Sequence, residues 1–126
     1  MKEPLWLTAE VILAVQEELL ARFGGLEGLR NECLLDSALN RPQHLFRYEQ
    51  PTLFEMAAAY AHGLVKNHPF LDGNKRISFM AAYIFLGANG HELDVPEAEA
   101  ALRTLALAAG EISADEYAAW LKESCS

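Results

Sequence analysis

Three kinds of chemically active side chain fall within nine residues, from His68 to Arg76. A histidine titrates near neutral pH and can accept a proton, and an aspartate offers a hard oxygen ligand to a divalent cation. Lysine and arginine both bind phosphate, the arginine through two parallel hydrogen bonds. The spacing therefore predicts a site in which His68, Asp72, Lys75 and Arg76 surround a negatively charged substrate.

A helix is predicted to begin inside this run. Pro69 disfavours helical backbone at His68, so the preceding helix should end just before it. Asp72 is a suitable N-cap, and Gly73 lets the backbone approach another group closely. The apolar stretch 77–88 is typical of a buried helix, whose first turn would face a cleft.

The two cations stand where a helix disfavours them, because its N-terminus carries a partial positive charge that costs each about 0.3–1 kcal/mol. A bound phosphate would compensate, since the free N–H groups of the first turn point at its oxygens. We therefore predict that Gly73, Asn74, Lys75 and Arg76 bind the phosphates of a nucleotide. The alternative is that Asp72 and other acidic side chains neutralise two solvated cations.

A carboxylate beside bound phosphates suits Mg²⁺, which usually takes one or two protein carboxylates and completes its shell with phosphate oxygens and water. His68 would then be free to remove a proton from an incoming hydroxyl. This combination predicts transfer of part of a nucleotide such as ATP to an alcohol, with Asp72 as the metal ligand.

The composition bounds the class of protein. The chain has 126 residues, of which 52% are hydrophobic, and abundant alanine and leucine favour a single all-α domain over 1–126. A net charge of −8 argues against direct nucleic-acid binding. The apolar run is too short to span a membrane and no signal peptide is recognisable, so a cytoplasmic location is expected. Cys33 and Cys125 are expected to be a buried and a terminal thiol.

About six helices are predicted around the buried helix that follows Asp72. Cap and stop residues define them: starts at Thr8, Asn31, Thr52 to Glu55, Pro96 and Ser113 to Glu116, and stops at Gly24-Gly25, Arg41-Pro42, Gly90 and Gly110. The fifth helix is expected to turn four residues inward, namely Ala98, Leu102, Leu105 and Ala109. His62 falls outside the apolar stripe of its helix, so it is expected either at the surface or just behind the residues of the site.

The segment 42–51 contains two prolines and no helical period. It is predicted to be the longest irregular stretch, and two interpretations are open. It could be a mobile flap beside the cleft, or it could be a simple connector.

The run from His68 to Arg76 resembles the signature of the Fic superfamily, and in particular of its death-on-curing (Doc) branch. Segments 24–30, 34–39 and 87–90 resemble that branch as well. The resemblance implies that His68 is the catalytic base, Phe70 the anchor of the loop in the core, and Asp72 the Mg²⁺ ligand. It also implies that Gly73 and Asn74 form the anion hole and that Arg76 holds phosphates.

Lys75 separates this chain from the superfamily members that transfer nucleotides, which have glycine there. The Doc branch shares the lysine, and the resemblance implies that it binds ATP in the reverse direction and phosphorylates a protein, with a translation elongation factor as target. Gly73, where the best-known form of the branch has alanine, keeps transfer of AMP open as an alternative.

Some superfamily members carry their own inhibitory helix, whose motif this sequence lacks. The resemblance therefore implies a separate antitoxin, whose disordered tail folds as a helix in a groove of the toxin. Two further alternatives are a domain that has lost catalysis and only binds a partner, and a plain helical bundle with a chance motif.

Overall fold

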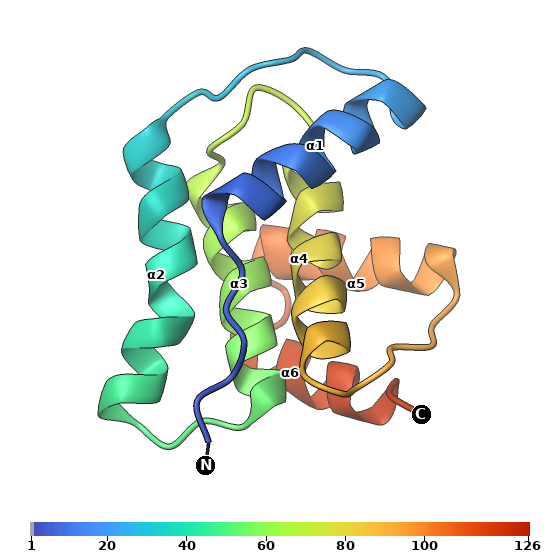
Figure 1. Ribbon diagram of the computed structural model, residues 1–126. Coiled ribbons are helices and arrows are strands. Elements are labelled where there is room, and N and C mark those ends of the chain that lie inside the picture. Colours follow the sequence, from blue (N-terminus) through green and yellow to red (C-terminus); the bar gives the residue numbers. More distant parts are fainter. Residues whose placement is uncertain (1) are drawn as a thin grey trace.

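The computed structural model describes residues 2–126, which form six helices and contain only isolated β-bridges. The helices are α1 (Ala9–Phe23), α2 (Glu32–Tyr48), α3 (Leu53–Asn67), α4 (Asn74–Ala88), α5 (Glu97–Ala109) and α6 (Ala114–Glu123). Helices α2, α3 and α4 lie side by side, and α1 crosses one end of them (Figure 1). The predicted all-α bundle of about six helices is confirmed.

Helix α3, and not the predicted α4, is the most deeply buried. It packs against α2, α4, α5 and α6, and every residue from Met56 to Ala61 is buried. Helix α4 lies beside it and keeps one side in solvent, where Tyr83 is 40% exposed. Alanine and glycine let neighbouring helices approach α3 closely: a Cβ on Gly63 would lie 3.2 Å from the Cα of Ala38. The sequence pointed to α4 as the buried helix because the apolar residues of α4 are larger than the alanines of α3.

Most helix ends follow the predicted caps. The side chains of Thr8, Asn31, Thr52 and Ser113 each accept a hydrogen bond from the first turn of their helix, and the last two form full capping boxes with Glu55 and Glu116. Pro96 is the N-cap of α5 and precedes its first residue. Helices α1 and α5 end at glycines with positive φ, as predicted.

The predicted stop at Arg41-Pro42 is wrong, because α2 continues through a buried Pro42 to Tyr48. Proline removes one helical hydrogen bond and strains the preceding turn, at a cost of about 3 kcal/mol. Contacts made by the last two turns offset this cost, among them the Phe46 ring packed edge-on at 5.7 Å from Trp6. The predicted irregular segment 42–51 is therefore mostly helix, and only residues 49–52 connect α2 to α3.

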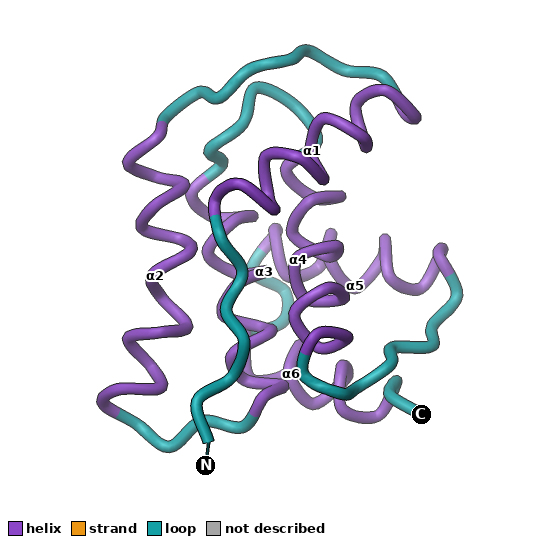
Figure 2. The backbone as a smooth tube through the Cα atoms, viewed as in Figure 1, coloured by secondary structure: helices purple, strands orange, loops and turns teal. Residues whose placement is uncertain are grey.

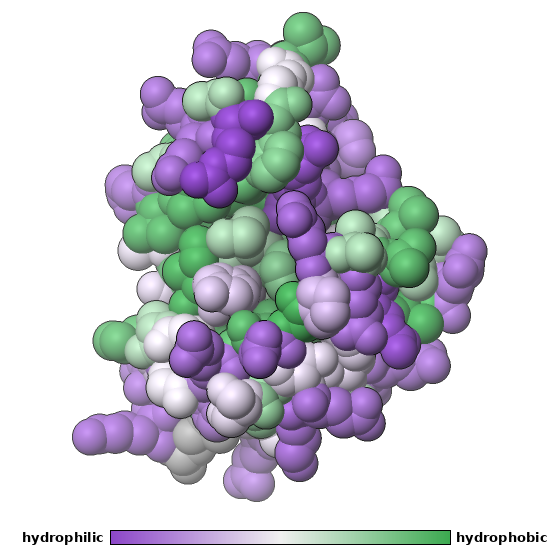
Figure 3. All heavy atoms as spheres, turned by 90° about the vertical axis from the view of Figure 1, so that its right-hand side faces the viewer, coloured by the Kyte–Doolittle hydropathy of each residue, from purple (hydrophilic) through white to green (hydrophobic). Residues whose placement is uncertain are grey.

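The inward face of α5 was also predicted wrongly. The buried residues are Ala100, Thr104 and Leu107, whereas Leu102 is 68% exposed and Leu105 is 49% exposed. Leucines lie on both sides of α5, so either side could have faced the core. A buried hydrogen bond of 2.8 Å between the hydroxyls of Thr104 and Tyr117 fixes the side that carries Thr104 toward the core. Hydrophobic groups accordingly reach the surface among polar ones on the side of the molecule seen in Figure 3.

Both cysteines are free thiols; Cys125 is half-buried, and Cys33 is exposed rather than buried as expected. Among residues 2–126, no helix has the length and apolarity needed to cross a membrane.

Candidate functional site

The loop between α3 and α4, residues 68–73, runs beside the linker between α1 and α2, residues 24–31. Figure 2 shows the two segments in teal at the same end of the molecule. Three backbone hydrogen bonds join them: Leu71 N–H to Gly28 O (3.1 Å), Arg30 N–H to Pro69 O (2.6 Å) and Asn31 N–H to Pro69 O (3.1 Å). The loop is thus held in place by the linker between α1 and α2.

Phe70 occupies the centre of this loop and is 2% exposed, as expected of an anchor in the core. Its backbone is bonded to the side chain of Asn74: its N–H donates to Oδ1 (3.1 Å), and its carbonyl accepts from Nδ2 (2.9 Å). The Asn74 amide therefore closes the loop, and the part of Asn74 left to face an anion is its backbone N–H.

Asp72 does not cap α4, contrary to prediction. The N-cap is Gly73, in the left-handed conformation with φ 77°, and no side chain bonds the first turn in its place. The Asp72 carboxylate instead accepts a hydrogen bond from the N–H of Leu26, at 3.0 Å, and so faces the linker. The N–H groups of the first turn of α4 are consequently open to a ligand.

Six residues that the sequence singled out line one hollow of about 330 Å³: His68, Asp72, Gly73, Asn74, Lys75 and Arg76. Lys75 and Arg76 lie in the first turn of α4, as predicted. The Arg76 guanidinium lies 4.5 Å from the centroid of the Phe23 ring of α1, an attraction that orients a cation without neutralising it. The hollow therefore combines a helix N-terminus with two positive side chains, an imidazole and a carboxylate.

His68 has an unusual backbone. Helix α3 ends at Asn67, as predicted, and His68 follows with φ 54° and ψ 54° as the one non-glycine residue of positive φ within residues 2–126. Glycine or asparagine is usual in this position, and other residues cost about 1–3 kcal/mol. The His68 N–H still donates to the carbonyl of Leu64, at 3.1 Å. The surrounding structure therefore holds this residue in a conformation it does not favour.

The side chain of Gln16, in α1, holds the loop by a hydrogen bond to its backbone. The sequence did not predict this role. Gln16 is 3% exposed, and its Nε2 donates to the carbonyl of Asp72, at 2.7 Å. A Cβ on Gly73 would lie 3.2 Å from the same nitrogen, so glycine serves both the positive φ and the close approach. Gln16 lies on the same face of α1 as Ile12 and Leu19. A polar residue on this apolar face was the feature of the sequence that could have indicated its role.

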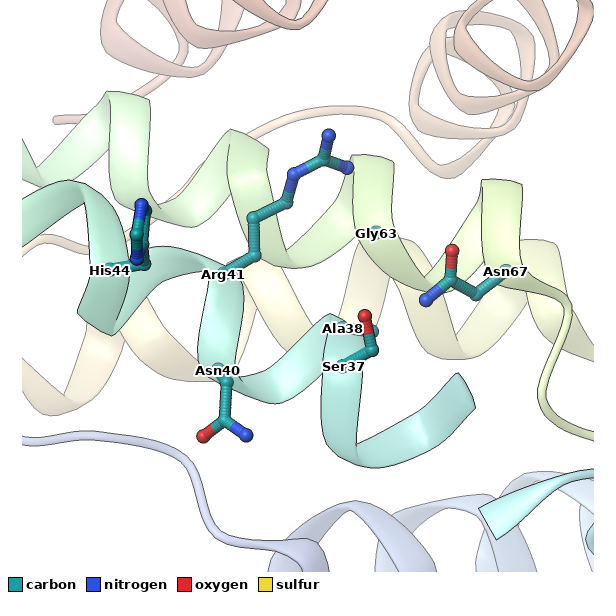
Figure 4. A pocket seen from close by; sticks show the side chains of 7 residues that line it. All are labelled: Ser37, Ala38, Asn40, Arg41, His44, Gly63 and Asn67. Atoms are coloured by element: carbon teal, nitrogen blue, oxygen red, sulfur yellow. The ribbon is translucent and has the colours of Figure 1, made fainter. Parts of the chain in front are cut away.

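A second hollow, of about 390 Å³, lies between α2 and α3 and includes Gly63 and Asn67 in its lining. Figure 4 shows that Arg41 and Asn40 point in opposite directions from α2, so its polar groups do not converge on one point. Arg41 Nη1 lies 3.0 Å from Nδ1 of His62, which is half-buried. Burial, followed by the charges of Arg41 and Lys66, lowers the pKa of His62. The loop hollow is the better candidate.

The side chains that line the loop hollow offer few ligand atoms to a metal ion. No group of three or more His, Cys, Asp or Glu side chains that could hold a metal occurs in the described part of the chain. Asp72 is the one carboxylate lining the hollow. A single carboxylate suffices for Mg²⁺ only when phosphates supply further ligands, so the site fits a metal that binds together with a nucleotide.

Comparison with known proteins shows the family of this chain. A family model described as the Fic/DOC family matches residues 6–86, which include α1 to α3, the loop and most of α4. The chain belongs to the Fic/Doc family. Within the family it is 34% identical to the "Protein kinase doc" of Escherichia phage P1 over 118 residues, which cover 92% of each chain. It is 42% identical to the "Toxin Doc" of Mycolicibacterium smegmatis over 83 residues, 61% of this Fic/Doc chain and 64% of that protein.

Proposed function

We propose that this Fic/Doc protein is a toxin that transfers the γ-phosphate of ATP to a Ser or Thr hydroxyl of a target protein. The observation that carries the proposal is the convergence of His68, Asp72 and the first turn of α4 on one hollow. The names of the two relatives, a protein kinase and a toxin, support it.

The proposed reaction uses few groups. The imidazole of His68 accepts the proton of the target hydroxyl, whose oxygen forms a bond to the γ-phosphorus as the bond to the bridging oxygen breaks and ADP leaves with that electron pair. Lys75, Arg76 and the N–H groups of α4 hold the negative phosphates in place. Asp72 would hold Mg²⁺, which supplies further neutralisation of phosphate charge when bound.

The direction of the nucleotide distinguishes this reaction from AMP transfer. Lys75 lines the hollow together with Gly73, and the Doc resemblance implies that a lysine here takes space that the phosphates occupy in members with glycine. This favours a nucleotide whose γ-phosphate is presented to the hydroxyl. Transfer of AMP from the α-phosphate is the competing outcome.

We infer two macromolecular partners. A translation elongation factor is the proposed target, and a separate antitoxin with a disordered segment is the proposed inhibitor; both follow from the Doc resemblance. Growth arrest on expression of the chain, relieved by co-expression of a small neighbouring gene, would support the second inference. Arrest that no such gene relieves would contradict it.

The decisive assay incubates the protein, Mg²⁺ and candidate target with ATP labelled at either the γ- or the α-phosphate. Label on the target from the γ position alone is expected; label from the α position alone would replace the proposal by AMP transfer. His68→Ala should lower the labelling rate by about 10²–10⁴-fold and leave a small residual rate. His44→Ala is the matched control, because His44 is an exposed histidine of α2 outside the loop hollow.

A further inference from the structure

Arg30, in the linker before α2, is bonded to three successive carbonyls at the end of α3. Its Nη2 donates to Asn67 O (2.9 Å), its Nε donates to His68 O (2.7 Å), and its backbone N–H donates to Pro69 O (2.6 Å). One residue thus fixes the backbone immediately before, at and after the histidine of the hollow.

The first two carbonyls belong to the last turn of a helix, where they have no intrahelical partner. A cation at this end is also favoured by the helix dipole. Arginine suits both carbonyls, because its planar guanidinium carries a positive charge and presents several donors in a fixed geometry. Lysine carries the same charge on a single ammonium nitrogen and lacks this planar arrangement of donors.

The bonds matter because of the backbone they hold. His68 has φ 54° without being glycine, and the Cβ direction of a residue follows from its backbone angles. If its carbonyl were released, the backbone could relax out of the left-handed region and the imidazole would swing away from the hollow. Displacement of a reacting group by about 1 Å can lower a rate about 100-fold.

We propose that Arg30 is a positioning residue that holds His68 in its left-handed conformation and so aims the imidazole at the substrate. Arg30 itself lies outside the residues that line the hollow. The inference rests on the proposed phosphotransfer for its kinetic readout. Its effect is therefore expected in kcat for target labelling, with little change in the KM for ATP.

The test compares Arg30→Ala and Arg30→Lys with Arg47→Ala. Arg47 lies in the last turn of α2 and is the matched control, since it is an exposed cation at another helix C-terminus. We expect both Arg30 variants to lower kcat by about tenfold or more while the KM for ATP stays within about twofold, and Arg47→Ala to leave both unchanged. Recovery of kcat in Arg30→Lys would show that charge alone matters and would overturn the proposal.

Two further measurements separate positioning from general stability. In a double-mutant cycle, adding Arg30→Ala to His68→Ala should change the residual activity by less than twofold, because the positioned group is already gone. Amide exchange at His68, Phe70 and Leu71 should accelerate in Arg30→Lys while exchange in the interior of α3 does not. A full additive loss, or unchanged exchange at the loop, would refute the inference.

The outcomes for Arg30 and for the proposed function are distinguishable. If His68→Ala keeps full activity, the proposed function fails whatever Arg30 does. If His68→Ala loses most of its activity and both Arg30 variants keep normal kcat, the positioning role fails and the proposed function stands.

Discussion

The side chain of Asn74 offers the sharpest test of how the loop is held. It is 3% exposed, and its amide forms two hydrogen bonds with the backbone of Phe70. Asn74→Ala would leave the buried N–H and carbonyl of Phe70 without partners. Each such group costs about 1–3 kcal/mol, and the better helix propensity of alanine returns about 0.5 kcal/mol. We expect the free energy of unfolding to fall by about 1.5–5.5 kcal/mol.

Urea unfolding followed by circular dichroism measures this loss. Asn40→Ala is the matched control, because Asn40 is an exposed asparagine of α2 that lies outside the loop hollow. It should change stability by less than about 0.5 kcal/mol. A loss at Asn74 no larger than this would show that the amide does not hold the loop and would refute the reasoning.

Asn74→Asp separates the two hydrogen bonds. An ionised aspartate can still accept from the Phe70 N–H, but it cannot donate to the Phe70 carbonyl. The protonated acid can donate, so folding should raise the pKa of the new carboxyl. The variant should therefore be closer to the wild type at low pH and lose stability, relative to the wild type, as pH rises through that pKa. A pH-independent difference would contradict this assignment of donor and acceptor.

Three further predictions concern the core and its titrating groups. Phe70→Ala should lower the free energy of unfolding by about 3–5 kcal/mol in the same urea assay, since the ring is buried. Burial raises the pKa of both Tyr60 and Tyr117 to about 12. The contribution of these two tyrosines to stability should therefore be constant below pH 10 and be lost as pH rises from 10 to 12, as followed by ultraviolet absorbance and circular dichroism. Burial first, and then nearby positive charge, lowers the pKa of His62 below 6.5, so its contribution to stability is present above that value and is lost as pH falls through the folded pKa. Arg41→Ala should raise that pKa in an NMR titration, and an unchanged value would show that the charge of Arg41 has no part in it.

Local signals predicted the helices well wherever the structure is decided within one turn. Thr52 with Glu55, and Ser113 with Glu116, form capping boxes from side chains three residues apart, so no distant contact is needed. The loop residues His68 to Arg76 are adjacent in sequence and the turn between two helices keeps them together. Their gathering around one hollow was therefore predictable.

Errors occurred where long-range packing outweighed a local preference. Pro42 is a strong local stop, but α2 continues because its last turns pack against the N-terminal segment, with Phe46 on Trp6. Leu102 and Leu105 are apolar enough to face inward, but the hydroxyl pair of Thr104 and Tyr117 turns α5 the other way.

The amino-acid sequence by itself determined the all-α class, most helix ends, and the set of residues that face the hollow, because each depends on neighbours within a few positions. Only the tertiary structure decided what holds those residues in place. Gln16 lies 56 residues from Asp72 and Arg30 lies 38 residues from His68, and both bond to backbone carbonyls that every residue carries. A carbonyl has no side-chain identity, so no sequence pattern marks it as a partner until folding brings the donor to it.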